Sequence, residues 1–514
     1  MKFILIMFSG DYLEKVEADA VVIGSGAAGL TAALTLAEGD SKVILLEKYP
    51  FIGGISKLGM GLSAVDPHKK DVAFKFLMDN LRWRVDARLV RAIINETIYA
   101  VEWLKEKGVE FDPPLELEFG FKMYLVKMPE KIEFAPEEPA WLGEARKEAT
   151  FQGGRTYRLI KTLFNRAIEK GVDVRTKTPA RKIITHNGHV VGVIAESESE
   201  ETIRINCKVV VIASGGFLHD KEMLKKYCGF EFGKDLFTMH GVELTGEGIK
   251  MAWEVGAFQD IESMAPQFAF IPGEGRWHGE LDLMLAVWGE PRNLWVNQEG
   301  KRFINEELCH PEKRDLMAMA IAAQKGRCAY VIFDENIKKA MKEGVIYPLY
   351  LYQPPLTKVR DLDSAIKRRL ERGERNIFIA DSVESLAIKI GVNPDTLRKT
   401  VEEYNLMCEK GYDDLFFKNP NYLYPIKQPK FYAFRQYASA YGTCGGIKIN
   451  EKAEVLDKEL NPVPGLYAAG DCANPLMIGG LLRVAMLYTF AVATGRIAGK
   501  SALEYISKFK HVEA

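Results

Sequence analysis

Three glycines and one acidic residue near the start of the chain have the spacing of a loop that binds a dinucleotide. Gly24, Gly26 and Gly29 follow a short apolar run, and Glu47 closes the next apolar run. In such a loop the first glycine makes the tight turn, the second lets the backbone approach a pyrophosphate, and the third lets helix and strand pack closely. An acid at this distance pairs with ribose hydroxyls and disfavours a 2′-phosphate, so the motif predicts FAD or NAD rather than NADP.

The elements around these residues are the ones that such a loop requires. Residues 19–23 predict a buried parallel strand, residues 30–38 a helix, and residues 42–46 a second strand. Residues 72–108 predict two helices, and residues 157–170 predict one more.

A small sheet is predicted between residues 172 and 212, with Asn187-Gly188 as the hairpin turn between two of its strands. Its predicted strands are 172–174, 180–184, 190–195 and 209–212. Residues 112–150 are rich in Pro and Glu and predict loop with short strands. From 262 to 437 the density of Pro, Trp, Tyr and charged residues rises, which indicates an inserted domain.

The composition excludes several classes of protein. Lys and Arg number 69 and Asp and Glu 70, a formal net charge of -1, which leaves no electrostatic footprint for nucleic acid or an anionic membrane. The seven cysteines contain no Cys-x-x-Cys pair, so neither haem attachment nor an iron–sulfur or disulfide framework is indicated. The apolar run at 3–8 is short for a signal peptide or a membrane span, so a cytoplasmic protein without stable membrane insertion is expected.

Several short segments carry a more specific signal. In chain order they are VVIGSGAAGL, GGISKLGMG, GGRTYRL, VVVIASGGF, TGEGIKMAWEVGA, NLWVNQEGKRFINE, AYVIFD, YGTCGGIKIN, PGLYAAGDC and TGRIAG. This series resembles the fumarate reductase/succinate dehydrogenase flavoprotein superfamily, which also includes 3-ketosteroid dehydrogenases and soluble enoate reductases. The resemblance implies an α/β fold in which a Rossmann-like FAD-binding domain of the glutathione-reductase type (residues 1–261 and 438–514) carries an inserted α+β capping domain (residues 262–437).

The resemblance also implies FAD, bound by both ends of the chain. Ser56 would contact phosphate, Ala180 the adenine, and Asp471 a ribityl hydroxyl, while the helix after Gly480 would face the flavin N1/C2 edge. The residues it assigns to FAD are Gly24, Gly26, Ala28, Gly29, Glu47, Lys48, Gly53, Gly54, Ser56, Gly59, Gly61, Ala180, Ala213, Gly215, Gly470, Asp471, Gly480 and Leu482. Members with covalent FAD use a histidine after the Gly-Gly pair; residues 56–59 contain none, so non-covalent FAD is expected.

The dicarboxylate-binding residues of the fumarate reductases are largely missing. Their two histidines fall at Gly442 and near Pro266, and their proton relay falls near Leu285 and Trp288. A dianion would be poorly paired in such a site, and burying an unpaired carboxylate costs several kcal/mol. We therefore expect a less charged, more apolar or aromatic activated alkene, or its saturated partner, rather than fumarate or succinate.

Two residues are the candidates for the proton-transfer role. Arg314 best matches the family's proton-donating arginine, although an insertion around residues 309–311 weakens the match. Tyr441 precedes the GTCGG turn, and a phenol can donate a proton to developing charge or act as a base when its pKa is perturbed. The alternative for Arg314 is a salt-bridged arginine, and for Tyr441 a packing residue.

The sequence leaves open the roles of a glycine segment and of two cysteines. Gly246-Glu247-Gly248 is either a second nucleotide loop or a helix start, and Cys444 and Cys472 are either reactive thiols or packing residues. The chain is expected to be an oxidoreductase acting on a C–C bond next to a carbonyl or carboxyl group. It would exchange electrons with an external protein, quinone or nicotinamide. An electron-transfer flavoprotein subunit and a flavin oxidase are the competing functions.

Overall fold

The computed structural model of the protein describes residues 14–128, 154–238, 240–272, 281–311, 313–348, 358–476 and 486–510. Within these ranges the chain mixes helices and strands around two large hydrophobic cores. The first core joins segments from both ends of the chain, and the second is built from residues between 283 and 434.

A six-stranded sheet occupies the centre of the first core. Its order is β17-β18-β11-β2-β3-β7, and every pair is parallel except β17 with β18. The strands are β2 (Ala20–Ile23), β3 (Val43–Leu46), β7 (Asp173–Arg175), β11 (Val209–Ile212), β17 (Glu454–Leu456) and β18 (Pro462–Ala468). Every residue of β2, β3 and β11 is buried, as expected for strands covered on both faces.

One sequence prediction is wrong here. The sequence pattern predicts residues 209–212 in the small sheet with residues 180–195, but β11 lies between β18 and β2, and β7 lies at the sheet's edge. The reason is the side-chain pattern of β11: all four residues are apolar and buried, so the strand needs cover on both faces.

The small sheet itself is present beside the parallel one. It has the order β1-β10-β9-β8, formed by β1 (Glu14–Glu17), β8 (Ala180–His186), β9 (His189–Glu196) and β10 (Thr202–Asn206). The predicted turn between β8 and β9 is confirmed, with φ of 51° at Asn187 and 78° at Gly188. Two successive positive φ values are the signature of a tight hairpin turn.

The predicted helices of this part of the chain are confirmed. They are α1 (Ala27–Glu38), α2 (Lys70–Asn80), α3 (Ala87–Glu106) and α5 (Thr156–Glu169). The helix after Gly480 that the resemblance implies is α14 (Met486–Lys510). Helices α1 and α14 pack closely. A Cβ on Gly495 of α14 would lie only 2.5 Å from the Ala28 carbonyl oxygen of α1, so this contact requires a glycine. A three-stranded sheet, β4-β6-β5, contains β4 (Gly61–Val65), β5 (Leu115–Glu116) and β6 (Phe121–Leu125). The rest of the predicted loop, residues 129–150, lies outside the described residues.

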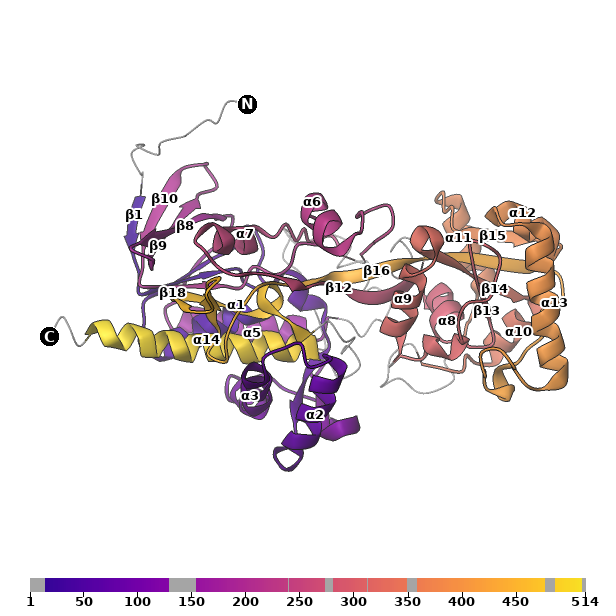
Figure 1. The fold of residues 1–514 in the computed structure, drawn as a ribbon, viewed down its shortest axis with the longest axis horizontal. Coiled ribbons are helices and arrows are strands. Elements are labelled where there is room, and N and C mark those ends of the chain that lie inside the picture. Colours follow the sequence, from indigo (N-terminus) through magenta and orange to yellow (C-terminus); the bar gives the residue numbers. More distant parts are fainter. Residues whose placement is uncertain are drawn as a thin grey trace.

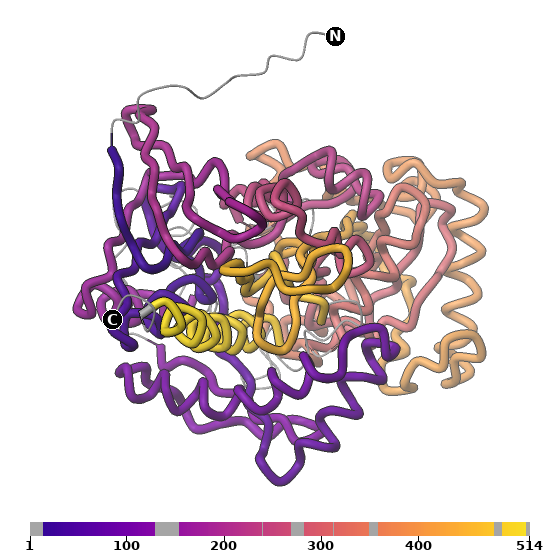
Figure 2. The backbone as a smooth tube through the Cα atoms, turned by 60° about the vertical axis from the view of Figure 1, so that its left-hand side comes forward, coloured from indigo at the N-terminus to yellow at the C-terminus, as the bar shows by residue number. Residues whose placement is uncertain are grey.

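Two long strands connect the two cores. They are β12 (Gln259–Pro272) and β16 (Phe431–Ile447), which pair antiparallel with bulges after Asp260 and Pro266. Figure 1 shows β16 running from the α1/α14 region to the far end of the molecule, with β12 beside the part nearer that region, and Figure 2 shows the backbone from another side. The predicted domain limits at 261/262 and 437/438 fall inside these strands.

Around the second core, β16 pairs with β14 and β15, and β14 pairs with β13. These strands and their surrounding helices are α8 (Leu281–Trp288), β13 (Leu294–Asn297), α9 (Arg314–Ala322), β14 (Cys328–Asp334), α10 (Glu335–Glu343), α11 (Leu362–Glu371), β15 (Ile377–Ala380), α12 (Val383–Ile390) and α13 (Pro394–Lys410). The short helices α6 (Lys221–Met223) and α7 (Glu247–Glu254) follow β11. No described helix combines the length and apolarity needed to cross a bilayer.

Candidate active site

The glycine turn after β2 has no room for side chains. Gly24 has a φ of +102°, and a Cβ there would lie 2.5 Å from the Ala213 carbonyl oxygen. A Cβ on Gly29 would lie 1.9 Å from the Gly24 carbonyl oxygen. Gly26 is the N-cap of α1 and brings no side chain to the helix N-terminus. The turn therefore presents only backbone atoms at the N-terminus of α1, a position where a bound phosphate group is favoured.

Glu47 lies beside this turn, at the end of β3. Its carboxylate accepts hydrogen bonds from the Ser25 backbone N–H (3.0 Å), the Ser25 hydroxyl (2.5 Å) and the Tyr49 backbone N–H (2.9 Å). The side chain is buried, so these bonds fix the carboxylate next to the glycine turn. The structure thus brings together the acid and the glycines that the sequence singled out.

The segment after Glu47 reaches the N-terminus of α1. The Ser56 hydroxyl accepts a hydrogen bond from the Ala27 backbone N–H at 3.1 Å, and both Gly53 and Gly54 have positive φ. Gly61 has a different explanation: a Cβ there would lie 2.0 Å from the Tyr124 carbonyl oxygen, so pairing of β4 with β6 already requires a glycine.

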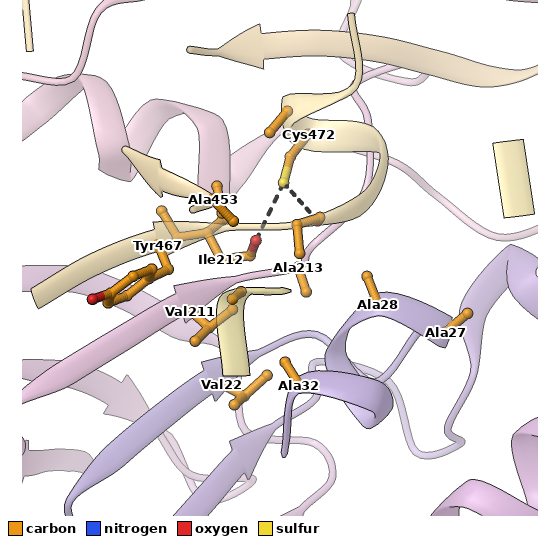
Figure 3. Close-up of a cluster of buried hydrophobic side chains, with 14 of the residues drawn as sticks. Val22, Ala27, Ala28, Ala32, Val211, Ile212, Ala213, Ala453, Tyr467 and Cys472 are labelled. Carbon is orange, nitrogen blue, oxygen red and sulfur yellow. Dashed lines mark hydrogen bonds between the residues drawn. The ribbon is translucent and has the colours of Figure 1, made fainter. Parts of the chain in front are cut away.

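The distant segments of the predicted cofactor site converge on the same place. Figure 3 shows Ala28 of α1 facing Ala213, which follows β11. Gly470 has a φ of +73°, and a Cβ there would lie 2.9 Å from the Ala28 Cβ. Gly215 also has positive φ, and Ala180 begins β8. Gly480 and Leu482 lie outside the described residues.

Two features singled out in the sequence have structural roles. The thiol of Cys472 donates to the carbonyl oxygens of Ile212 and Ala469 (Figure 3), and burial raises its pKa to about 12. In the Gly246-Glu247-Gly248 segment, a Cβ on Gly248 would lie 2.1 Å from the Ser214 hydroxyl. Close packing therefore accounts for that glycine.

Lys48 is held by the start of α7. Its ammonium group donates to the Thr245 hydroxyl at 2.8 Å and pairs with Glu247 at 3.1 Å. The interaction ties the end of β3 to the segment that follows β11. Lys48 thus lies next to the glycine turn region with its charge already compensated.

Asp471 connects the first core with the long strands. The thiol of Cys444, on β16, lies 3.9 Å from the Asp471 carboxylate, and the Gln267 amide donates to the Cys444 sulfur at 2.8 Å. Burial raises the pKa of Asp471 to about 6, while hydrogen bonds from Gln267, Asn474 and Cys444 act in the opposite direction. Burial also raises the pKa of the Cys444 thiol far above its usual value, which argues against a reactive thiolate.

The charges of the two candidate proton-transfer residues act on each other. Burial raises the pKa of the Tyr441 phenol, and the positive charge of Arg314 lowers it in part. Arg314 donates to the backbone carbonyls of Cys309 (3.0 Å), Trp288 (3.1 Å) and Pro348 (3.1 Å). Its guanidinium also lies 4.7 Å from the centre of the Trp288 ring. The cation is thus fixed by carbonyl oxygens and an aromatic face.

Two aliphatic side chains and one uncharged amide surround the position after Tyr441. A Cβ on Gly442 would point to Leu244 (3.2 Å), Gln267 (3.4 Å) and Ile55 (3.6 Å). Pro266 pairs with Thr443 across the two long strands. Where the resemblance places histidines that bind a dicarboxylate, this chain therefore has a glycine and a proline, with two aliphatic side chains close to the first.

The sequence reasoning missed His219, His240 and Gln267. His240 Nε2 lies 2.5 Å from the Tyr441 carbonyl oxygen, and the two histidine rings are 6.0 Å apart. Their spacing in the chain matches no catalytic motif. The only signal in the sequence was the position of Gln267, directly after the singled-out Pro266.

These residues fit a bound FAD. The helix N-terminus capped by a glycine, the Ser56 hydroxyl next to it and the Glu47 carboxylate offer the groups that a pyrophosphate and a ribose need. The glycines keep the backbone open at this place.

Comparison with known proteins shows the family of the chain. The profile of the FAD binding domain family matches residues 19–480. The vinyl phenol reductase of Lactiplantibacillus plantarum is 30% identical, over 95% of this chain and 96% of its own. The NADH:acrylate oxidoreductase of Vibrio harveyi is 28% identical, over 95% of this chain and 50% of its own. A solved structure, the open conformation of a flavocytochrome c3 fumarate reductase, gives a TM-score of 0.66 at 25% identity, over 96% of this chain and 79% of that one.

The family match spans most of the chain and includes both the glycine turn and Asp471. The vinyl phenol reductase aligns over nearly the full length of both chains, and its 30% identity supports the same family. The chain is an FAD-binding oxidoreductase and belongs to the fumarate reductase/succinate dehydrogenase flavoprotein superfamily.

Proposed function

We propose that the chain reduces, or in the reverse direction forms, the C=C bond of a small, uncharged, conjugated alkene. The observation that carries this proposal is the charge of Arg314 acting on Tyr441, next to a glycine that faces two aliphatic side chains, Leu244 and Ile55, and the uncharged amide of Gln267. One proton donor, one fixed cation and an apolar wall suit an alkene whose charge develops only during the reaction.

The apolar wall is the reason to place fumarate low among the substrates. A dicarboxylate needs cationic or donor groups at both ends, because a buried carboxylate without partners costs several kcal/mol. At Gly442 and Pro266 this chain offers no such side chain. The name of the vinyl phenol reductase relative supports an aromatic, uncharged alkene.

In this proposal Tyr441 gives the proton and Arg314 stabilises the charge that the proton leaves behind. Because burial raises its pKa, the Tyr441 phenol stays protonated at neutral pH. Arg314 keeps its own proton, since a guanidinium has a pKa above 12. Its charge favours the phenolate that forms when Tyr441 donates. FAD, when bound, supplies the hydride in the reducing direction and accepts it in the reverse one.

The cofactor site in this proposal is the one around α1. Gly24, Gly26 and Ser56 hold the pyrophosphate, Glu47 the adenosine ribose, and Asp471 the ribityl chain. The parallel sheet is a Rossmann-like layer, the binding of FAD is non-covalent, and residues 262–437 cap the site. An external donor in the cytoplasm, a protein, quinone or nicotinamide, reduces the flavin.

The experiment that tests the proposal is an anaerobic alkene panel. The holoenzyme is photoreduced and mixed with 4-vinylphenol, styrene, cyclic enones, steroid enones, cinnamate, acrylate and fumarate. We expect the flavin absorbance to return fastest with an uncharged aryl alkene or enone. Fumarate as the fastest substrate would refute the argument from Gly442 and Pro266. If no alkene and no saturated partner exchanged electrons with the flavin, an electron-transfer subunit would replace the proposed enzyme. Rapid reoxidation by oxygen with peroxide release would indicate an oxidase.

A further inference from the structure

The turn between α2 and α3 presents a tryptophan to solvent. Trp83 is 60% exposed, and both Arg82 and Trp83 have positive φ, 53° and 57°. The turn closes α2, because the Trp83 backbone N–H donates to the Met78 carbonyl oxygen at 2.9 Å. Such a helix end favours glycine, since a larger side chain is strained in this conformation. An exposed indole held in a strained turn points to a role in binding and not in packing.

The Trp83 ring is held in place by its neighbours. Its Nε1 donates to the Asp79 carboxylate at 2.9 Å, and the ring meets Phe74 edge to face, with the ring centres 6.2 Å apart. The Arg91 guanidinium lies over the same Phe74 ring at 5.0 Å. Indole, phenyl ring and guanidinium therefore form one fixed group on the surface of α2 and α3, which Figure 1 shows below α14.

Three exposed arginines of this region form no ion pair with a described residue. Arg82 lies in the turn, and Arg88 and Arg91 lie one turn apart at the start of α3. The nearby carboxylates are already used: Asp79 accepts from the indole, and Asp86 caps α3 by accepting from the Arg88 backbone N–H at 2.7 Å. A guanidinium offers a fork of donors that matches a carboxylate in two hydrogen bonds, so the arginines fit acidic side chains of another molecule. We call this set the α2–α3 surface: Phe74, Arg82, Trp83, Arg88 and Arg91.

The α2–α3 surface lies close to the proposed cofactor site. In the same turn, Arg84 pairs with Glu262 of β12 at 2.8 Å. Three residues further along β12, Ala265 pairs with Cys444 of β16, and the Cys444 thiol lies 3.9 Å from the Asp471 carboxylate. Three residues of a strand span about 10 Å. Electron transfer between proteins requires a short distance between their redox groups, and a protein docked on this surface meets that requirement.

We infer that the α2–α3 surface docks an acidic electron-transfer protein that supplies the electrons for the reaction. The inference rests on the proposed reduction of an alkene and names the external donor that this reaction needs. Two donor molecules, each oxidised by one electron, and one proton from water bring FAD to the state that transfers a hydride. Tryptophan and arginine dominate the binding energy of protein interfaces. A bilayer surface is bound by a whole apolar helix face, whereas the exposed apolar group here is a single indole.

Calorimetric titration of the holoenzyme with oxidised flavodoxin, a small acidic electron-transfer protein, measures the docking without turnover. We expect binding that weakens as salt is added, because salt screens exposed charges. Trp83→Ala and Arg88→Glu should each weaken the affinity at least about tenfold, as expected for central residues of an interface. Arg88→Glu should fold, since an acid is favoured in the first turn of a helix. Arg372→Glu is the matched control and should keep the wild-type affinity: Arg372 is exposed at the end of α11, without an ion-pair partner among the described residues.

The same variants are compared in anaerobic reduction of the flavin, without an alkene. Reduced flavodoxin should reduce the flavin of Arg88→Glu at least about tenfold more slowly than that of the wild type, because charge at an interface sets the rate of encounter. Dithionite, a small donor that needs no docking, should reduce both at the same rate. Binding of flavodoxin to the wild type without electron transfer would overturn the inference.

Three further results would overturn it: no binding of flavodoxin to the wild type, wild-type affinity in both Trp83→Ala and Arg88→Glu, or an equal loss in Arg372→Glu. Binding of the wild type to phosphatidylserine vesicles but not to flavodoxin would assign the surface to a membrane instead. The outcome is separable from the proposed function. Reduction by flavodoxin with a silent alkene panel would refute the reductase alone, and alkene reduction without binding of flavodoxin would refute the docking surface alone.

Discussion

The glycine turn and the Arg314–Tyr441 junction are built from different kinds of contact. At the turn, the close distances join backbone to backbone: a Cβ on Gly29 would meet the Gly24 carbonyl, and one on Gly24 would meet the Ala213 carbonyl. At the junction, the charge of a guanidinium at the start of α9 acts on a phenol of β16, and the guanidinium lies over an aromatic ring from α8. The first arrangement tolerates almost no substitution, whereas the second can exchange side chains and so exchange substrates.

The largest effect is expected where backbone leaves no space. Gly29→Ala places a Cβ 1.9 Å from the Gly24 carbonyl oxygen, and neither atom belongs to a flexible side chain. We expect purified protein without FAD, measured by the ratio of absorbance at 450 nm to that at 280 nm. Gly171→Ala is the control, because Gly171 lies outside the cofactor site and a Cβ there would meet nothing within 4 Å. Equal loss of FAD in both variants would contradict the contrast in packing.

At the junction, removal of one oxygen should abolish chemistry and leave the cofactor in place. Tyr441→Phe should lower the rate of alkene-dependent flavin reoxidation by about 10²–10⁴-fold, the usual contribution of a positioned acid. Its FAD content should match the wild type. Tyr437→Phe, on the same strand where it pairs with Cys328, controls for loss of a hydroxyl from β16. A wild-type rate in Tyr441→Phe would transfer the donor role to another group.

The same contrast explains how much of the molecule the sequence predicts. The glycine turn, Glu47 and the Asn187-Gly188 hairpin are local patterns whose residue types follow from backbone conformation, and the structure places them as expected. The sheet partner of β11 was not predictable in this way. An apolar run such as Val209–Ile212 reports burial on both faces but not which strands supply its neighbours.

The junction was predicted only in part, for a physical reason. Arg314 and Tyr441 could be singled out by resemblance, but their proximity depends on how α9 and β16 meet. His240 carried no signal, because its partner is the backbone carbonyl of Tyr441, an atom present at every position of a chain. That Ile55 and Leu244 face Gly442 could likewise be learned only from the folded structure.

A smaller effect on catalysis is expected when the Trp288 ring, which packs against the Arg314 guanidinium, is replaced. Trp288 stands where the resemblance places part of an ionic relay, and its face holds the guanidinium at 4.7 Å. A cation–π contact contributes about 0.5–2 kcal/mol, so Trp288→Leu should lower kcat by about 2- to 30-fold while KM changes little. Trp288→Phe should restore most of kcat. A change confined to KM would show that Trp288 binds substrate instead of positioning Arg314.

The last effect is a small shift in melting temperature and not a loss of activity, and it concerns Asp471, where the cofactor region meets the long strands. Its pKa in the folded protein is about 6, above the ordinary value of 3.8, so the folded state binds this proton more tightly than the unfolded state does. The contribution of Asp471 to stability is therefore greatest below about pH 4, falls as the pH rises to about 6, and is constant above that.

The free energy of unfolding that Asp471 contributes differs by about 3 kcal/mol between the two limits of pH, or about 3 °C in Tm for a chain of this length. Thermal denaturation of the FAD-free protein at pH 4.5 and pH 7 measures about two-thirds of it, with Asp471→Asn as the reference. Because asparagine does not titrate, the wild type should lose more Tm than the variant between the two pH values. Equal losses would show that hydrogen bonds from Gln267 and Cys444 already offset the burial of the carboxylate.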